Sequence, residues 1–192
     1  GEWVLNEACH KAVRWREITG TDIGVSVNVS PRQFRDQGFT SAVMKALEAS
    51  GLAPEKLELE ITERLILDNT IETADILKQL DAAGIRLSVD DFGTGYSALS
   101  YLKSYPFDTL KIDKSFVQDV MKEHDDASLV KAIINMAHSL GLSVIAEGVE
   151  EEAQTHFLQK QGCDYSQGYF YSRPIPEVEF EEWLKTNHRV HA

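Results

Sequence analysis

Short apolar segments alternate with amphipathic segments six times along the chain, and this alternation constrains the fold more than any other feature. Each pair takes about thirty residues, a spacing that predicts a parallel sheet with crossover helices, hence an α/β fold. Even spacing without a linker rich in Pro, Gly or Ser predicts a single domain, and both an open sheet and a closed barrel fit the pattern. The expected strands are 25–29, 57–61, 87–89, 109–113, 142–146 and 165–171.

The helices between these strands are predicted from apolar residues at three- and four-residue spacing, often followed by a glycine. The clearest one begins at Asp125 or Asp126, either of which can cap it, and ends at Gly141. The tail from Asn187 is polar, and we expect it to be frayed. The other expected helices are 2–16, 40–50, 70–83, 97–103 and 151–161, with a last one opening at Pro176.

Polar residues stand at the C-terminal end of every expected strand. In a β/α barrel all of these ends face one mouth, where chemistry takes place. Acidic residues ending consecutive strands would repel one another there, and divalent cations would offset that repulsion. Because His and Cys are absent from the set, its oxygen ligands favour Mg²⁺, Mn²⁺ or Ca²⁺ over zinc. The residues are Asn28, Glu60, Asp90 with Asp91, Lys111 with Asp113, Glu147 and Gln167.

The segment 86–96, RLSVDDFGTGY, places Asp90 and Asp91 side by side before a glycine-rich turn. One interpretation is a cation site. In the other, one aspartate caps the next helix and its neighbour faces solvent. Taken alone the segment slightly favours the second interpretation, and the acids on the other strands favour the first. Lys111 has two interpretations as well, because it could orient a water or phosphate oxygen, or form a salt bridge with a strand-end acid.

Residues 93–98, GTGYSA, superficially match a dinucleotide-binding fingerprint. Asp90 and Asp91 would then lie beside the pyrophosphate, and the helix that follows is too short, so we reject this interpretation. The six histidines show no shared spacing and receive no role, and Cys9 and Cys163 are expected to be reduced.

The net charge of −12 argues against a nucleic-acid groove, so no DNA partner is expected. It does not exclude a phosphate ligand held through metal ions. No apolar run is long enough to cross a bilayer. We expect a cytoplasmic location, in a parent protein that can still be anchored to a membrane elsewhere.

Six motifs in order resemble the EAL-domain family of cyclic di-GMP phosphodiesterases. They are VNVSPRQF, ELEITE, DDFGTGYSAL, LKIDKSF, IAEGVE and GCDYSQGYFYSRP, and the resemblance runs from Trp3 to about Trp183. It implies a modified TIM barrel that opens cyclic di-GMP to linear pGpG, with two Mg²⁺ or Mn²⁺ ions as cofactors and Ca²⁺ as an inhibitor of turnover.

The resemblance also implies roles for individual residues. Asn28, Glu60 and Asp90 would hold one cation, and Asp90, Asp91 and Glu147 the other. Glu147 and Lys111 would act on the attacking water, Gln167 and Asp91 would contact the substrate or its water, and Glu63 would anchor the DDFGTGY loop.

The Glu-Ala-Leu triplet that gives the family its name, with its metal-binding Glu and a nearby Arg, is absent from this sequence. Six strands rather than eight predict a partial EAL domain over residues 1–192, without the first two strands and first helix. We expect such a fragment to be inactive and to self-associate through its open edges, as a homodimer, with a sensory or cyclase-like domain upstream in the parent. The alternatives are a silent cyclic di-GMP-binding module and an enolase-type barrel in which Lys111 abstracts a proton.

Overall fold

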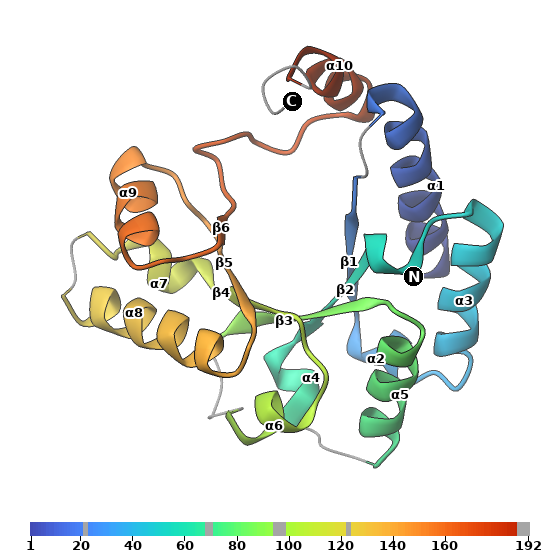
Figure 1. Ribbon diagram of the computed structural model, residues 1–192, viewed down its shortest axis with the longest axis horizontal. Coiled ribbons are helices and arrows are strands. Elements are labelled where there is room, and N and C mark those ends of the chain that lie inside the picture. Colours follow the sequence, from blue (N-terminus) through green and yellow to red (C-terminus); the bar gives the residue numbers. More distant parts are fainter. Residues whose placement is uncertain (21–22, 68–70, 94–98, 122–123, 188–192) are drawn as a thin grey trace. The chain divides into compact units, whose positions relative to one another are not determined.

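The computed structural model describes residues 1–20, 23–67, 71–93, 99–121 and 124–187. The chain forms two compact units, one of residues 1–59, 79–86 and 174–192, the other of residues 60–78 and 87–173. Six strands follow one another in the sheet in chain order, from β1 to β6 (Figure 1). The predicted alternation of strands and helices, and with it the α/β class, is confirmed.

The elements have the following bounds. They are α1 (Glu2–Thr19), β1 (Val25–Val29), α2 (Pro31–Phe34), α3 (Phe39–Ser50), the 3₁₀ turn η1 (Pro54–Lys56), β2 (Leu57–Thr62), α4 (Glu63–Leu67), α5 (Ile71–Ala82), β3 (Arg86–Phe92), α6 (Leu99–Ser104), β4 (Thr109–Ile112), α7 (Lys114–Gln118), α8 (His124–Ser139), β5 (Ser143–Ala146), α9 (Glu152–Lys160), β6 (Tyr165–Ser166) and α10 (Glu177–Asn187).

In the first unit, α1 packs against α3, β1 and α10. Helix α1 buries Leu5, Cys9 and Ala12 at helical spacing, which gives it one apolar face. An edge-on contact between Trp15 and Phe180, with ring centroids 4.7 Å apart, joins it to α10. The last helix is thereby fixed to the first one within this unit.

In the second unit, β3, β4, β5 and β6 pair in parallel. All four residues of β4 are buried, as expected of a strand with both faces covered. Helix α8 packs on β4 and β5 and buries Val130, Ile134 and Ala137. Because these strands run in the same direction, the residues that follow them meet at one edge of the sheet.

Two aspartates fix the edge of this sheet at which its strands begin. Asp108, just before β4, accepts a hydrogen bond of 2.8 Å from the backbone N–H of Leu87 in β3. Asp164, just before β6, accepts one of 2.8 Å from the N–H of Val144 in β5. Each aspartate therefore connects the start of one strand to the second residue of a neighbouring strand. These contacts fix the register of the strands, and the register determines which residues lie together at their C-terminal ends.

The sixth strand is shorter than predicted, with β6 covering Tyr165 and Ser166 instead of residues 165–171. Beyond it the chain turns, because the N–H of Tyr171 donates to the carbonyl of Gly168 at 3.1 Å. The aromatic residues 169–171 gave the segment strand-like character, but they belong to this turn, where Tyr169 and Tyr171 are exposed.

Other boundaries differ by a few residues. Helix α8 begins at His124, so Asp125 and Asp126 lie in its first turn instead of at its cap. The short helices α2, α4 and α7 were not predicted. The predicted cap at Thr70, the glycine-rich segment after Gly93 and the tail after Asn187 lie outside the described residues.

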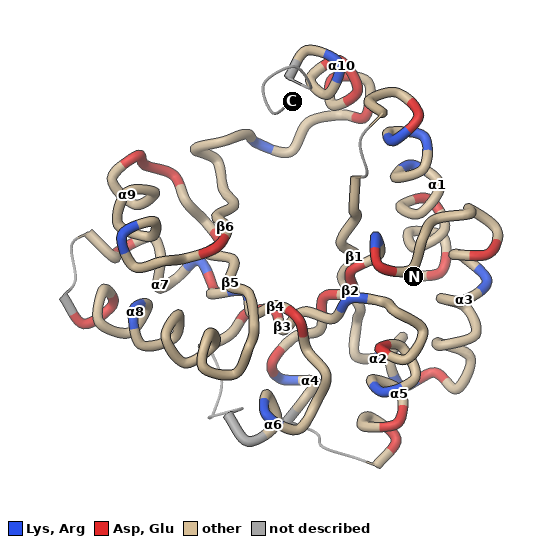
Figure 2. The backbone as a smooth tube through the Cα atoms, in the orientation of Figure 1, with Lys and Arg blue, Asp and Glu red and all other residues tan. Residues whose placement is uncertain are grey.

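Acidic positions occur on most of the helices as well as on the strands, so the negative charge is not confined to one place (Figure 2). Within the described part of the chain, no helix combines the length and the apolar character that crossing a membrane requires.

Candidate metal centre

The centre of the site is a β-bulge at the end of β3. The pairing of β3 with β4 shifts between Val89 and Phe92, and Asp91 has a left-handed backbone with φ of 55°. Adjacent residues of a regular strand point to opposite faces, whereas a bulge can turn an extra side chain toward its neighbour. Aspartate enters the left-handed region more readily than most residues. The bulge therefore allows Asp90 and Asp91 to serve one site.

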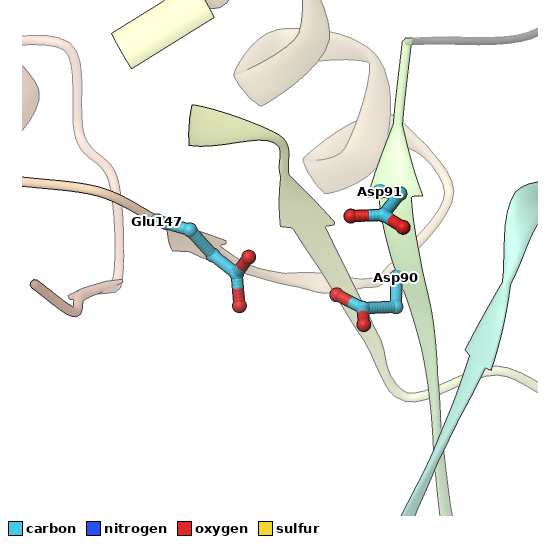
Figure 3. Close-up of side chains that lie close together, drawn as sticks. All are labelled: Asp90, Asp91 and Glu147. Carbon is cyan, nitrogen blue, oxygen red and sulfur yellow. The ribbon is translucent and has the colours of Figure 1, made fainter. Parts of the chain in front are cut away.

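Three carboxylates meet at this edge of the second unit. One oxygen from each of Asp90, Asp91 and Glu147 lies within 4.8 Å of the others. Figure 3 shows the two aspartates on β3 and Glu147 on the segment that follows β5, with its carboxylate directed toward them. Residues far apart in sequence thus converge, as predicted for the ends of parallel strands.

Lys111 of β4 lies among the acids. Its Nζ is 2.8 Å from Glu60, 3.2 Å from Asp90 and 2.7 Å from Glu147. The lysine side chain is only 4% exposed. One ammonium therefore holds carboxylates from β2, β3 and the end of β5 together, and the salt-bridge interpretation of Lys111 is confirmed.

The close approach of these charged groups determines the direction in which their pKa values shift. Burial opposes the charge of Lys111, but its hydrogen bonds to Glu147 and Glu60 outweigh burial and raise its pKa. Burial raises the pKa of Glu147, against the effect of Lys111. Burial also raises the pKa of Asp91, and the charges of Asp90 and Asp113 add to this effect. The acids are thus placed where an added cation would favour their ionised forms.

Asp113, the other polar residue predicted at the end of the fourth strand, caps α7. Its carboxylate accepts a hydrogen bond of 2.9 Å from the N–H of Ser115. Its charge lies close enough to Asp91 to raise the pKa of that residue. Asp113 thus serves as the cap of the helix that follows β4.

Glu147 also borders a pocket of about 230 Å³ beside the carboxylates. Gln167 lines this pocket as well, so two of the predicted site residues share one cavity. Lys114 and Tyr169 contribute a cation and an aromatic ring to its wall. The pocket offers a polar compartment next to Glu147.

Glu63 is buried and lies at the start of α4. Its Oε2 accepts a hydrogen bond of 3.1 Å from the N–H of Gly93, directly after β3. This contact is what an anchor of the DDFGTGY loop would make, and the loop's further residues lie outside the described part.

Asn28 lies on the exposed side of β1, in the first unit. Its assignment as a ligand remains a prediction, because the converging carboxylates all belong to the second unit. One residue with a supporting position, Gln154, was not singled out. It is the N3 residue of α9 in a capping box with Glu151, and this three-residue spacing in the sequence is the signal that could have identified it.

The donor set fits a divalent cation. Asp90 Oδ1 is buried, and although it lies 3.2 Å from Lys111 Nζ, no described donor is aligned with it for a hydrogen bond. A buried carboxylate oxygen without an aligned donor can accept a coordination bond. Carboxylate oxygens are the ligands that Mg²⁺, Mn²⁺ and Ca²⁺ prefer.

Comparison with known proteins gives one family. A sequence model of the EAL domain matches residues 1–174. The signalling protein YkoW of Bacillus subtilis is 45% identical over 184 residues, which cover 96% of this chain and 23% of YkoW. MucR of Pseudomonas aeruginosa, a bifunctional diguanylate cyclase and cyclic di-GMP phosphodiesterase, is 43% identical over 92% of this chain and 26% of MucR. The chain thus spans about a quarter of these relatives.

Solved structures agree with this result. The MucR phosphodiesterase in complex with c-di-GMP has a TM-score of 0.90 at 42% identity, covering 94% of this chain and 73% of that one. Klebsiella pneumoniae BlrP1, solved with manganese and cyclic di-GMP, has a TM-score of 0.78 at 29% identity, covering 90% of this chain and 45% of that one. BlrP1 has also been solved with calcium and cyclic di-GMP. These likenesses confirm the predicted TIM-like fold type.

Proposed function

The chain belongs to the EAL domain family, and from this premise we propose that its carboxylate site serves metal-dependent hydrolysis of cyclic di-GMP to linear pGpG. The observation that carries the proposal is the meeting of Asp90, Asp91 and Glu147 within 4.8 Å. MucR and BlrP1, which this chain resembles, bind c-di-GMP in their solved structures, and manganese or calcium accompanies it in BlrP1.

Two Mg²⁺ or Mn²⁺ ions are the proposed cofactors. Asp90, Asp91 and Glu147 would hold one of them, and Asn28 and Glu60 would hold the other together with Asp90. Two cations bound in this way would activate a water and stabilise the oxygen that leaves a phosphodiester. Ca²⁺, with its longer and more flexible coordination, is proposed to support binding with little turnover.

The protein's own groups have separate tasks in this proposal. The Glu147 carboxylate would help to activate the attacking water. Lys111 Nζ, 2.7 Å from Glu147 Oε1, holds that carboxylate in position. Gln167, on the wall of the neighbouring pocket, orients the water or a phosphate oxygen. The Glu63 contact with Gly93 steadies the chain that leaves the paired aspartates.

The proposal is tested by incubating the full native chain with cyclic di-GMP and Mn²⁺, then separating the products by chromatography. The expected product is linear pGpG, formed in the presence of Mg²⁺ or Mn²⁺ and lost with a chelator. A D90N/D91N variant serves as the matched control and is expected to form none. Recovery of intact cyclic di-GMP from the wild-type reaction would contradict the proposal.

The contacts of Lys111 favour a second candidate, a module that binds cyclic di-GMP without cleaving it. Its ammonium lies within ion-pair distance of Glu60, Asp90 and Glu147 and so neutralises part of their charge. Calorimetry would separate the two candidates. Heat of binding with Ca²⁺ but no product with Mn²⁺ would favour the silent module.

The proposal also covers how the chain assembles with itself and with neighbouring domains. We expect the chain to pair as a homodimer and to work beside a sensory or cyclase-like domain, as the bifunctional name of MucR illustrates for that relative. Light scattering at several concentrations tests the first point. A monomer at all concentrations would contradict it.

A further inference from the structure

Gln154 is a buried amide of α9 whose side chain forms hydrogen bonds through both of its polar atoms. It lies in the first turn of α9 and is 3% exposed. Its Oε1 accepts hydrogen bonds from the backbone N–H groups of Glu150 and Glu151, at 2.7 and 2.9 Å. Its Nε2 donates to the carbonyls of Val117 and Gln118, at 3.2 and 3.1 Å. Both ends of the side chain are therefore used.

The two segments that Gln154 joins both lead to site carboxylates. On one side is the segment 147–151, whose first residue, Glu147, is fixed by a hydrogen bond of 3.1 Å from its N–H to the carbonyl of Ile112. On the other side is the end of α7, a helix whose cap residue, Asp113, donates from its N–H to the carbonyl of Phe92, next to Asp91 in β3, at 3.5 Å. A single side chain thus connects the support of Glu147 with the support of Asp91.

The capping box accounts for only one of the four hydrogen bonds of the Gln154 side chain. In the capping box the side chain of Gln154 accepts from the N–H of Glu151, and the Glu151 side chain accepts from the N–H of Gln154. The Nε2 bonds go to α7, more than thirty positions earlier in the chain. A residue that only closed its own helix would have no need of them.

We infer that Gln154 is a positioning residue that holds Glu147 and Asp91 at the separation a shared divalent cation requires. This inference rests on the proposed function of the same site. Residues that orient ligands without touching the metal commonly affect metal affinity by about 10- to 100-fold. A hydrophobic residue of similar length would fill the space but would form none of the side-chain hydrogen bonds to the two segments.

The test compares Gln154→Met with Gln159→Met, a change at an exposed glutamine of the same helix. Mn²⁺ affinity is measured by calorimetry or by the electron paramagnetic resonance signal of free Mn²⁺, with no nucleotide present. Q154M is expected to bind Mn²⁺ about 10-fold more weakly than wild type, with Q159M unchanged. Circular dichroism and thermal unfolding are recorded on the same samples.

A merely structural role would give a different result. Q154M would then unfold at a lower temperature but bind Mn²⁺ with wild-type affinity well below that temperature, and this outcome would overturn the inference. If Q154M does not fold, Q154E takes its place, because it keeps an oxygen that can accept from the N–H groups of Glu150 and Glu151 but has no amide to donate to α7. Wild-type Mn²⁺ affinity in Q154E would overturn the inference equally.

The failure of this inference is distinguishable from the failure of the proposed function. Wild-type protein that binds Mn²⁺ but releases no pGpG would refute the phosphodiesterase proposal, while the Mn²⁺ affinities of the variants would still decide the role of Gln154. Conversely, a wild-type enzyme that is fully active together with a Q154M variant of unchanged Mn²⁺ affinity would refute only the role of Gln154.

Discussion

Gly168 lies so close to Val149 that a Cβ on the glycine would fall 2.1 Å from the Val149 carbonyl oxygen. The N–H of Val149 donates to the carbonyl of Gln167, and its own carbonyl accepts from the N–H of Phe170. The segment after Glu147 and the turn after β6 are thus joined backbone to backbone, which places Gln167 beside Glu147. Only a residue without a side chain allows this approach.

We predict that Gly168→Ala destabilises the protein by about 1–3 kcal/mol, because backbone atoms have to move apart. The displaced segments carry Glu147 and Gln167, so Mn²⁺ binding should weaken too. Urea unfolding and calorimetry measure the two effects. Gly38→Ala is the control, since its Cβ would meet only the Asp36 carboxylate, at 3.2 Å. Equal effects of both substitutions would contradict the explanation.

Replacing Lys111 by Met should cost about 3–5 kcal/mol of stability in metal-free protein, because buried carboxylates would lose their counter-charge. Added Mn²⁺ should restore part of the loss, since a cation at the site would take over this neutralisation. Chemical denaturation with and without Mn²⁺ measures both effects. Lys160→Met, on the exposed end of α9, should change neither. A K111M variant as stable as wild type would show that the acids do not depend on the ammonium.

Removing the charge of Asp91, unlike removing that of Lys111, is expected to stabilise the metal-free protein. Asn tolerates the left-handed backbone at this position and removes a charge that lies next to Asp90 and Asp113. Metal-free Asp91→Asn should therefore melt slightly higher than wild type, by about 1–3 °C. Mn²⁺ should raise the melting temperature of wild type much more than that of the variant. A variant that gains as much from Mn²⁺ as wild type does would exclude Asp91 as a ligand.

The Asp164 carboxylate gives a pH dependence away from the site. Burial acts to raise its pKa, but the hydrogen bonds from His138 and from the Val144 N–H outweigh burial and lower it. An aspartate whose pKa is lower in the folded than in the unfolded chain stabilises the fold at pH values above the unfolded-state pKa, near 3.9. This stabilisation is lost as the pH falls through the folded-state pKa. Wild type should thus be more stable than Asp164→Asn at pH 7.

The difference should shrink as the pH falls below the unfolded-state pKa and through the lowered folded-state pKa of Asp164. Urea titrations of the two proteins between pH 3 and 7 measure it. A stability difference that stayed constant over this range would show that the charge of Asp164 contributes nothing.

Much of the fold follows from local sequence. Apolar runs identify the strands, and glycines such as Gly51 and Gly141 follow the helices that they were expected to end. The sixth strand shows the limit of such patterns. Its aromatic residues have high strand propensity, but the contact between Gly168 and Val149 turns the chain after two residues, and that contact joins segments separated in sequence.

The candidate site, too, could be predicted from the sequence only in part. The positions of Asp90 and Glu147 at strand ends predict that they meet, since parallel strands end at one edge. The left-handed backbone of Asp91 and the three contacts of Lys111 depend on the pairing register of neighbouring strands, which the sequence does not show. Asp113 stands at a strand end in the sequence like the other acids, and its hydrogen bond from the Ser115 N–H places it as a helix cap.

The proposed metal site is tested most directly by anomalous diffraction from Mn²⁺-soaked crystals, recorded at the manganese absorption edge. We expect a peak within about 2.5 Å of carboxylate oxygens of Asp90, Asp91 and Glu147, with Lys111 withdrawn from at least one of them. Crystals soaked in the same way that show no peak there, with Lys111 still bridging Asp90 and Glu147, would contradict it.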